Sequence, residues 1–168
     1  PGEMFVHRNV ANIVVNTDVN LMSVLQYALE VLRVKHVIVC GHYGCGAIKA
    51  AITKESYGLI DAWLKNIKDV YRIYREELDI LPDLEQKQER LVELNVKEQV
   101  LNLAKGRIIQ RAWAASEKYP ILHGWVYDIN TGILNDIIKI EPEDYKDELY
   151  RFDDKSFKKI IKSNGSVE

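Results

Sequence analysis

A histidine and a cysteine lie three residues apart near the end of the first quarter of the chain. His42 and Cys45 alternate with Gly41, Gly44 and Gly46. Imidazole and thiolate are both good ligands for the borderline-soft Zn²⁺ ion, so this spacing indicates part of a zinc site. The pair is too small to hold zinc alone, because protein zinc sites usually take three or four protein ligands.

Three interpretations of this turn stay open on the residues alone. Cys40 is a candidate third zinc ligand, although a cysteine within a strand can direct its thiol into the core. Without a metal, the turn would hold a buried cysteine, a surface histidine and glycines that permit a tight turn. A redox dithiol of Cys40 and Cys45 fits less well, because four residues rather than two separate them.

The residues around the turn predict a strand that leads into a helix. Residues 37–40 form a short apolar run typical of a buried strand, and residues 47–52 have a helical pattern. Upstream, residues 4–11 are expected to form another strand, and apolar side chains recur at helical spacing over residues 21–32, after Asn20 as N-cap. Strand, helix and strand in this order predict a parallel βαβ unit with a right-handed crossover.

The middle of the chain has a mainly helical pattern. One apolar stripe covers residues 59–74, and a charged helix is expected over residues 83–94. Asn95 and Glu98 resemble a capping box and predict that a further helix begins there and ends before Pro120.

The C-terminal third predicts a hairpin. Residues 121–129 and 133–140 have strand-like patterns, and Asn130, Thr131 and Gly132 join them. The fold class is therefore expected to be α/β. We expect a mostly parallel sheet built on a βαβ unit, flanked by helices, with an antiparallel C-terminal hairpin.

Composition excludes several classes of protein. The 168 residues suffice for a single domain, carry a net charge of −2 and are 47% hydrophobic. This charge gives no electrostatic case for nucleic acid or an anionic membrane as a partner. No apolar run approaches the roughly 20 residues of a transmembrane helix. The two cysteines share one segment, which favours a reducing, cytoplasmic location over a secreted disulfide framework.

Three segments together carry a resemblance to a known family. They are residues 1–12 (PGEMFVHRNVAN), residues 40–46 (CGHYGCG) and residues 123–128 (HGWVYD). In this order and at these separations they resemble the β-class carbonic anhydrases, over about residues 1–140. The His-x-x-Cys turn alone would be a weak signal, whereas the combination is specific.

The resemblance implies a zinc ion held by two cysteines and one histidine. His42 and Cys45 match two of these ligands. In the family the other cysteine lies in an upstream Cys-x-Asp-x-Arg motif, carried by a central strand of the sheet, and this sequence has no such motif. Residues 1–168 are therefore expected to be a single domain that is incomplete at its N-terminus. An evolved loss of that strand is the alternative.

The activity implied is the reversible hydration of CO₂ to bicarbonate and a proton, by attack of metal-bound hydroxide. Zinc makes this attack feasible at neutral pH by lowering the pKa of its bound water. The backbone N–H of Gly46 would lie near the zinc-bound oxygen, and Phe5, Val10 and Tyr27 match the apolar wall of the substrate pocket. Ordinary helix N-terminal geometry and plain core packing are the respective alternatives.

Arg8 and Tyr127 match two members of a regulatory bicarbonate site found in one subtype of the family. The third member, a tryptophan, would lie upstream of this sequence. An arginine within an apolar segment needs an anionic partner. An ion pair with Glu3 or Asp128 is the alternative role for Arg8.

The family resemblance further implies a homodimer or homotetramer. Two other functions stay open. One is a non-catalytic or zinc-free protein with the family fold, and the other is a hydrolase of another small electrophile, such as carbon disulfide. His7, His36 and His123 are expected to be structural rather than catalytic.

Overall fold

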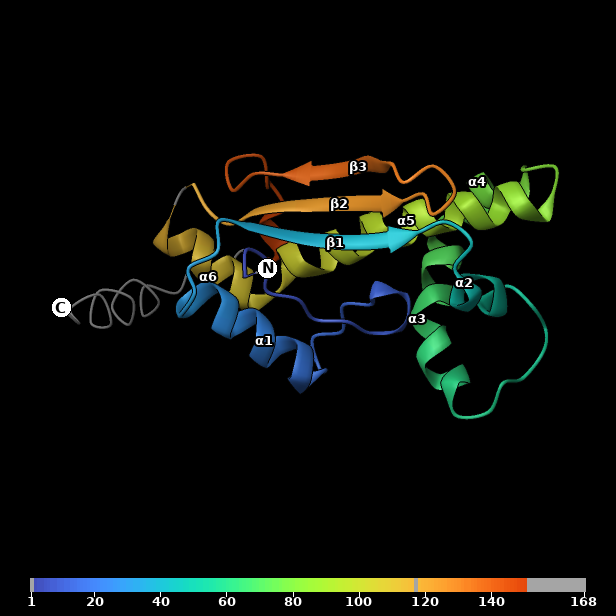
Figure 1. The fold of residues 1–168 in the computed structure, drawn as a ribbon, viewed down its shortest axis with the longest axis horizontal. Helices are drawn as coiled ribbons and strands as arrows, with labels where there is room; N and C mark the ends of the chain where they lie inside the picture. Colours follow the sequence, from blue (N-terminus) through green and yellow to red (C-terminus); the bar gives the residue numbers. More distant parts are fainter. Residues whose placement is uncertain (1, 117, 151–168) are drawn as a thin grey trace.

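A three-stranded mixed sheet forms one layer of the protein. The computed structural model describes residues 2–116 and 118–150. Strand β1 (His36–His42) pairs in parallel with β2 (Ile121–Tyr127), which pairs antiparallel with β3 (Leu134–Ile140) (Figure 1). The α/β class, a parallel crossover and the C-terminal antiparallel hairpin are thus confirmed.

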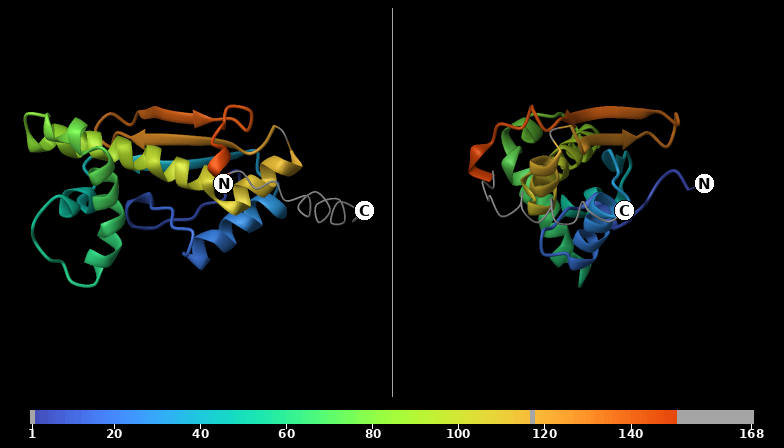
Figure 2. Two further views of the ribbon diagram at one scale, coloured as in Figure 1. Left: turned by 180° about the vertical axis from the view of Figure 1, so that it is seen from behind. Right: turned by 90° about the vertical axis from the view of Figure 1, so that its left-hand side faces the viewer.

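The helices gather on one side of this sheet (Figure 2). Helix α5 lies along the sheet and contacts all three strands. No helix in the described ranges is both long enough and apolar enough to cross a membrane. In chain order the helices are η1 (Val10–Asn12), α1 (Val19–Glu30), α2 (Gly46–Ala51), α3 (Ile60–Ile73), α4 (Arg75–Asp79), α5 (Leu84–Lys105), α6 (Arg107–Ala115) and η2 (Glu148–Tyr150).

Two strand glycines let α5 approach the sheet closely. A Cβ atom added at Gly124 would lie 2.9 Å from a methyl of Val96 and 3.0 Å from a methyl of Val100. One added at Gly41 would lie 2.7 Å from the other Val96 methyl. Both valines are fully buried. The backbone of β1 therefore runs directly beneath α5 at the residue that precedes His42.

The opposite face of the sheet is much more open. Along β1 the buried positions alternate with exposed ones, and His36, Ile38, Cys40 and His42 are all exposed. Within the described part of the chain, β1 pairs only with β2, so its other edge has no strand neighbour.

The strand predicted over residues 4–11 is wrong. Residues 4–9 belong to no strand, and the segment then turns into η1. Met4 and Val6 are 77% and 64% exposed, so their apolar side chains are not held in a sheet as the pattern predicted. The parallel unit is formed instead by β1 and β2, which the helices from α2 to α6 connect.

Two predicted helix starts are also wrong. Helix α5 continues through Asn95, because this buried amide donates to Ala11 O (3.0 Å) and accepts from Gln99 (3.0 Å) rather than capping a new helix. Helix α1 is capped by Asp18 and not by Asn20. The Asp18 carboxylate accepts from the backbone N–H groups of Asn20 and Leu21, in the first turn of the helix, at 3.1 and 3.2 Å.

Candidate metal centre

The strand and the helix predicted around the glycine-rich turn are both present. His42 is the last residue of β1, and Cys45 is the N-cap residue of α2. Between them Gly44 has a φ of +71°, a left-handed conformation that glycine adopts without strain. The chain thus reverses sharply, so that both donor side chains come from one turn.

A backbone hydrogen bond selects the tautomer of His42. Its Nδ1 lies 2.9 Å from the carbonyl oxygen of Tyr43. Because a carbonyl can only accept, Nδ1 carries the proton and the lone pair remains on Nε2. A metal-binding histidine is commonly oriented in this way, with one ring nitrogen donating to a carbonyl and the other free to coordinate. His42 is an exposed residue, and its Nε2 keeps the lone pair that a metal would take.

The types of donor in this turn fit zinc, but their number does not. His42 and Cys45 offer an imidazole nitrogen and a free thiol. Among the described residues, no group of three or more His, Cys, Asp or Glu side chains could hold a metal ion. The described residues therefore provide two of the donors that zinc needs.

Cys40 does not complete the set. Contrary to one expectation from the sequence, its side chain is exposed and lies on the open face of the sheet, as does that of His42. The thiol lies 3.5 Å from the carbonyl oxygen of Gly41, to which it donates. Partial desolvation raises the pKa of Cys40, which disfavours the thiolate that a metal would need.

Two of the residues predicted to line a substrate pocket lie together. The rings of Phe5 and Tyr27 are 5.8 Å apart between centroids and tilted by 42°. Both are about half exposed, at 49% and 48%. Val10 is similarly exposed, and its carbonyl accepts a hydrogen bond from the Trp63 indole at 2.8 Å. The rings of Phe5 and Tyr27 thus form an apolar surface, and the Val10 side chain likewise lies outside the closed core.

Among the described residues, Arg8 has no anionic partner of the kind that the sequence led us to expect. Its side chain is exposed, and within the described ranges it forms no ion pair with Glu3 or Asp128. The Asp128 carboxylate instead accepts from the backbone of Asn130 and from Thr131, both at 2.8 Å. Exposure removes the need for an ion pair, because solvent screens the guanidinium.

Gly46 and Tyr127 both lie next to the turn that carries His42 and Cys45. Gly46 is the first residue of α2, where a backbone N–H has no acceptor within the helix. Tyr127 ends β2, and its carbonyl accepts from the backbone N–H of Tyr43 at 3.1 Å. This bond joins the turn of residues 42–45, called the donor turn below, to the neighbouring strand β2.

A carbonic anhydrase family model matches residues 1–134. The chain belongs to the β-class carbonic anhydrase family. It is 46% identical over 136 residues to a carbonic anhydrase of Emericella nidulans, a match that covers 81% of this chain and 59% of that protein. The chain therefore spans 59% of that relative's length.

Solved β-carbonic anhydrases have the same fold. The Coccomyxa enzyme in complex with acetazolamide aligns over 100% of this chain and 75% of its own, with a TM-score of 0.80 and 34% identity. The structures of two tetrameric β-carbonic anhydrases from Sordaria macrospora include a chain that aligns with this one at a TM-score of 0.78 and 36% identity. That alignment covers 83% of this chain and 71% of the other.

Sequence reasoning missed two features of this carbonic anhydrase chain. The phenol of Tyr43, inside the donor turn, donates to Glu93 of α5 at 2.8 Å. His36 and His123 lie across the β1–β2 pair with Nδ1 and Nε2 3.0 Å apart. Both contacts join residues at least 50 positions apart, so local patterns carried no signal for either. The alternation of the two parallel strands would have predicted the histidine pair once their register was known.

Proposed function

We propose that this chain is the larger part of a zinc-dependent carbonic anhydrase that interconverts CO₂ with bicarbonate and a proton. The observation that carries the proposal is the His42 turn within a chain of this family. The hydrogen bond to the Tyr43 carbonyl leaves Nε2 free for a metal, and Cys45 follows on the same turn. When bound, zinc would supply a water of lowered pKa near neutral pH.

The residues of this chain would hold and surround the reacting groups. His42 and Cys45 would bind the metal, and the N–H of Gly46 would donate to an oxygen at the site. The apolar surface of Phe5 and Tyr27 suits a nonpolar gas and would exclude water from it.

We propose that the third ligand and the Asp-Arg pair lie on a strand upstream of Pro1 in the complete protein. The edge of β1 that has no strand neighbour in the described part of the chain supports this arrangement. A cysteine there would complete a three-ligand site.

The bicarbonate role of Arg8 and Tyr127 remains a proposal. Its support is that Arg8 is exposed and forms no ion pair or side-chain hydrogen bond with another described residue. Replacing Arg8 with alanine should remove the inhibition of the complete enzyme at high bicarbonate. Inhibition that persists unchanged would contradict the role.

We also propose that the protein works as a homodimer or homotetramer in the cytoplasm. Tetrameric relatives in Sordaria macrospora and the exposed apolar side chains of this chain support the assembly. The free thiols of Cys40 and Cys45 support a reducing compartment. Light scattering of the purified protein would give its oligomeric state.

The test compares this chain with a version extended upstream to include a Cys-x-Asp-x-Arg strand. Metal content and the rate of CO₂ hydration are measured on both. We expect weak zinc binding and little activity in the short chain, and tight zinc binding with activity in the extended one. His42→Ala in the extended chain should abolish both, while Tyr74→Phe, remote in sequence from the turn, should leave both unchanged.

Two outcomes would overturn the proposal in different ways. Zinc without activity in the extended chain would favour a non-catalytic protein with the family fold, which the shortage of donors among the described residues already makes worth testing. Zinc with hydrolysis of carbon disulfide, but not hydration of CO₂, would favour a different small electrophile as substrate.

A further inference from the structure

Tyr43, which separates His42 from Gly44, has each of its polar groups engaged. Its N–H donates to Tyr127 O at 3.1 Å, and its carbonyl accepts from His42 Nδ1 at 2.9 Å. Its phenol donates to Glu93 Oε1 at 2.8 Å. One residue thus connects the candidate metal ligand to β2 on one side and to α5 on the other.

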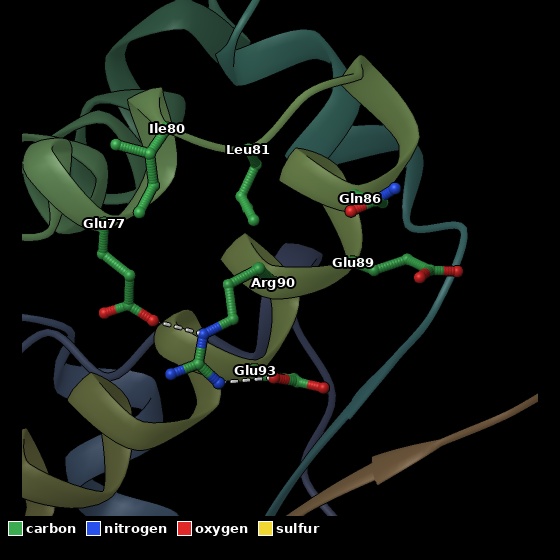
Figure 3. Close-up of a pocket in the computed structure, with 7 residues that line it drawn as sticks. All are labelled: Glu77, Ile80, Leu81, Gln86, Glu89, Arg90 and Glu93. Carbon is green, nitrogen blue, oxygen red and sulfur yellow. Dashed lines mark hydrogen bonds and ion pairs between the residues drawn. The ribbon is translucent and has the colours of Figure 1, made fainter.

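The carboxylate that receives this phenol is itself held in place. Arg90 donates through Nη1 to Glu93 Oε2 at 2.6 Å and through Nε to Glu77 Oε1 at 2.5 Å. Figure 3 shows these two contacts at a cavity of about 310 Å³ between α4 and α5. Both oxygens of Glu93 are therefore used, one by Tyr43 and one by Arg90, which fixes the carboxylate at both ends.

The phenol remains a donor at every pH at which the protein would work. Burial, together with the hydrogen bond to Glu93 and the negative charges of Glu93 and Glu89, raises the pKa of Tyr43 to about 12. The nearby side chain of Asn135 in β3 opposes this rise of the pKa in part. The phenol therefore keeps its proton at neutral pH.

We propose that Glu93, fixed by Arg90, is a positioning residue that orients His42 through Tyr43. Holding the phenol fixes the peptide between Tyr43 and Gly44, whose carbonyl keeps the proton on His42 Nδ1 and leaves Nε2 for the metal. This inference rests on the proposed zinc site. It adds that residues of α4 and α5, outside the donor turn, set the geometry of a ligand.

The chain contains a matched control for this link. Tyr74 donates through its phenol to Glu98 Oε1 at 2.7 Å, also a carboxylate of α5. Tyr74 lies at the junction of α3 and α4, and it belongs to no hydrogen bond of the donor turn. Tyr43→Phe and Tyr74→Phe therefore remove the same type of bond, one at the turn and one away from it.

The first readout is the tautomer of His42, measured by ¹⁵N NMR of the imidazole in the intact, metal-free chain. In wild type and in Tyr74→Phe we expect the Nδ1–H form to predominate. In Tyr43→Phe we expect a measurable shift of the population toward the Nε2–H form. A folded Tyr43→Phe variant with an unchanged tautomer population would overturn the proposal, as would an equal change in Tyr74→Phe.

The second readout is the dissociation constant for Zn²⁺, obtained by competition with a chelating dye. Loss of a supporting partner of a ligand typically costs about tenfold or more in metal affinity, so we expect roughly a tenfold loss in Tyr43→Phe and none in Tyr74→Phe. Glu93→Gln keeps an acceptor for the phenol but loses the charged contact to Arg90, so its effect should be smaller. An effect of Glu93→Gln larger than that of Tyr43→Phe would contradict the proposed series of contacts, in which Glu93 acts on His42 through Tyr43.

These readouts separate the two proposals. If neither the wild-type chain nor its extended form binds zinc, the proposed function fails, whereas the tautomer measurement still decides whether Tyr43 positions His42. If zinc binds and the tautomer does not respond, the positioning role fails and the proposed function stands.

Discussion

Replacing Gly41 with alanine tests the close contact between β1 and α5 from which the donor turn emerges. The new Cβ atom would lie 2.7 Å from a methyl of Val96 and 3.2 Å from the side-chain oxygen of Asn12. Val96 is fully buried, so its methyl cannot move away freely. Such overpacking costs about 1–3 kcal/mol of stability.

Part of this loss is offset in the unfolded state. Replacing glycine by alanine lowers the conformational entropy of the unfolded chain and stabilises the fold by about 0.4–1 kcal/mol where the backbone conformation suits alanine. Gly41 has no left-handed φ and lies within a strand, so the offset applies. The net loss should be about 1–2 kcal/mol, which for a chain of this size lowers Tm by roughly 2–8 °C.

The assay is urea or thermal unfolding of Gly41→Ala beside a control from the same turn. Nothing lies within 4 Å of a Cβ added at Gly46, so Gly46→Ala should be neutral or slightly stabilising. Val96→Ala alone should cost about 2 kcal/mol from lost burial and a small cavity. In the double variant the new methyl occupies the space of the lost one, so the losses should fall short of additivity by about 1 kcal/mol. A fully stable Gly41→Ala, or strictly additive losses, would refute the reasoning.

Three other substitutions test features outside this contact. Gln99→Leu should cost about 1–3 kcal/mol in urea unfolding, because it leaves the buried N–H of Val14, now 2.8 Å from the Gln99 amide oxygen, without an acceptor. A variant as stable as wild type would contradict this. Burial and the neighbouring His36 lower the pKa of His123, so the unfolded chain binds its proton more readily. Stability should therefore be complete above about pH 6.5, the ordinary histidine value, and fall as the pH drops below it. His123→Asn should flatten the dependence of Tm on pH, and an equally steep curve in that variant would assign the loss to other groups. Asp18→Ala should cost about 1 kcal/mol by removing the N-cap of α1, and unchanged unfolding would show that the cap contributes little.

Local chemistry in the sequence predicted much of the sheet and the donor turn. The apolar run before Gly41 gave β1, and the Asn130-Thr131-Gly132 loop gave the hairpin of β2 and β3. Each of these signals depends on neighbours in the chain. The same holds for His42 and Cys45, whose placement at the end of a strand and the start of a helix follows from Gly44 between them and from Gly41 and Gly46 on either side.

Features that depend on distant partners were not predictable. Residues 4–9 have the composition of a strand, but a strand forms only where another strand accepts its hydrogen bonds, and none does so among the described residues. Asparagine is a residue type that often caps helices. The side-chain amide of Asn95, however, hydrogen-bonds with Ala11 and Gln99, and the helix continues through it. The bond between Tyr43 and Glu93 depends on how α5 packs against β1, which no pattern of either segment contains.

One edge of β1 has no strand neighbour among the residues that the structure describes, and this matters for handling the isolated chain. An unprotected strand edge is a template on which another molecule can add a strand, and proteins usually guard such edges with charged residues, proline or a bulge. Val37, Ile38 and Val39 supply no such guard, and Ile38 is 40% exposed. Concentrated solutions of this chain should therefore be prone to self-association by edge-to-edge strand addition. A segment that pairs with β1 would therefore raise the solubility of the chain.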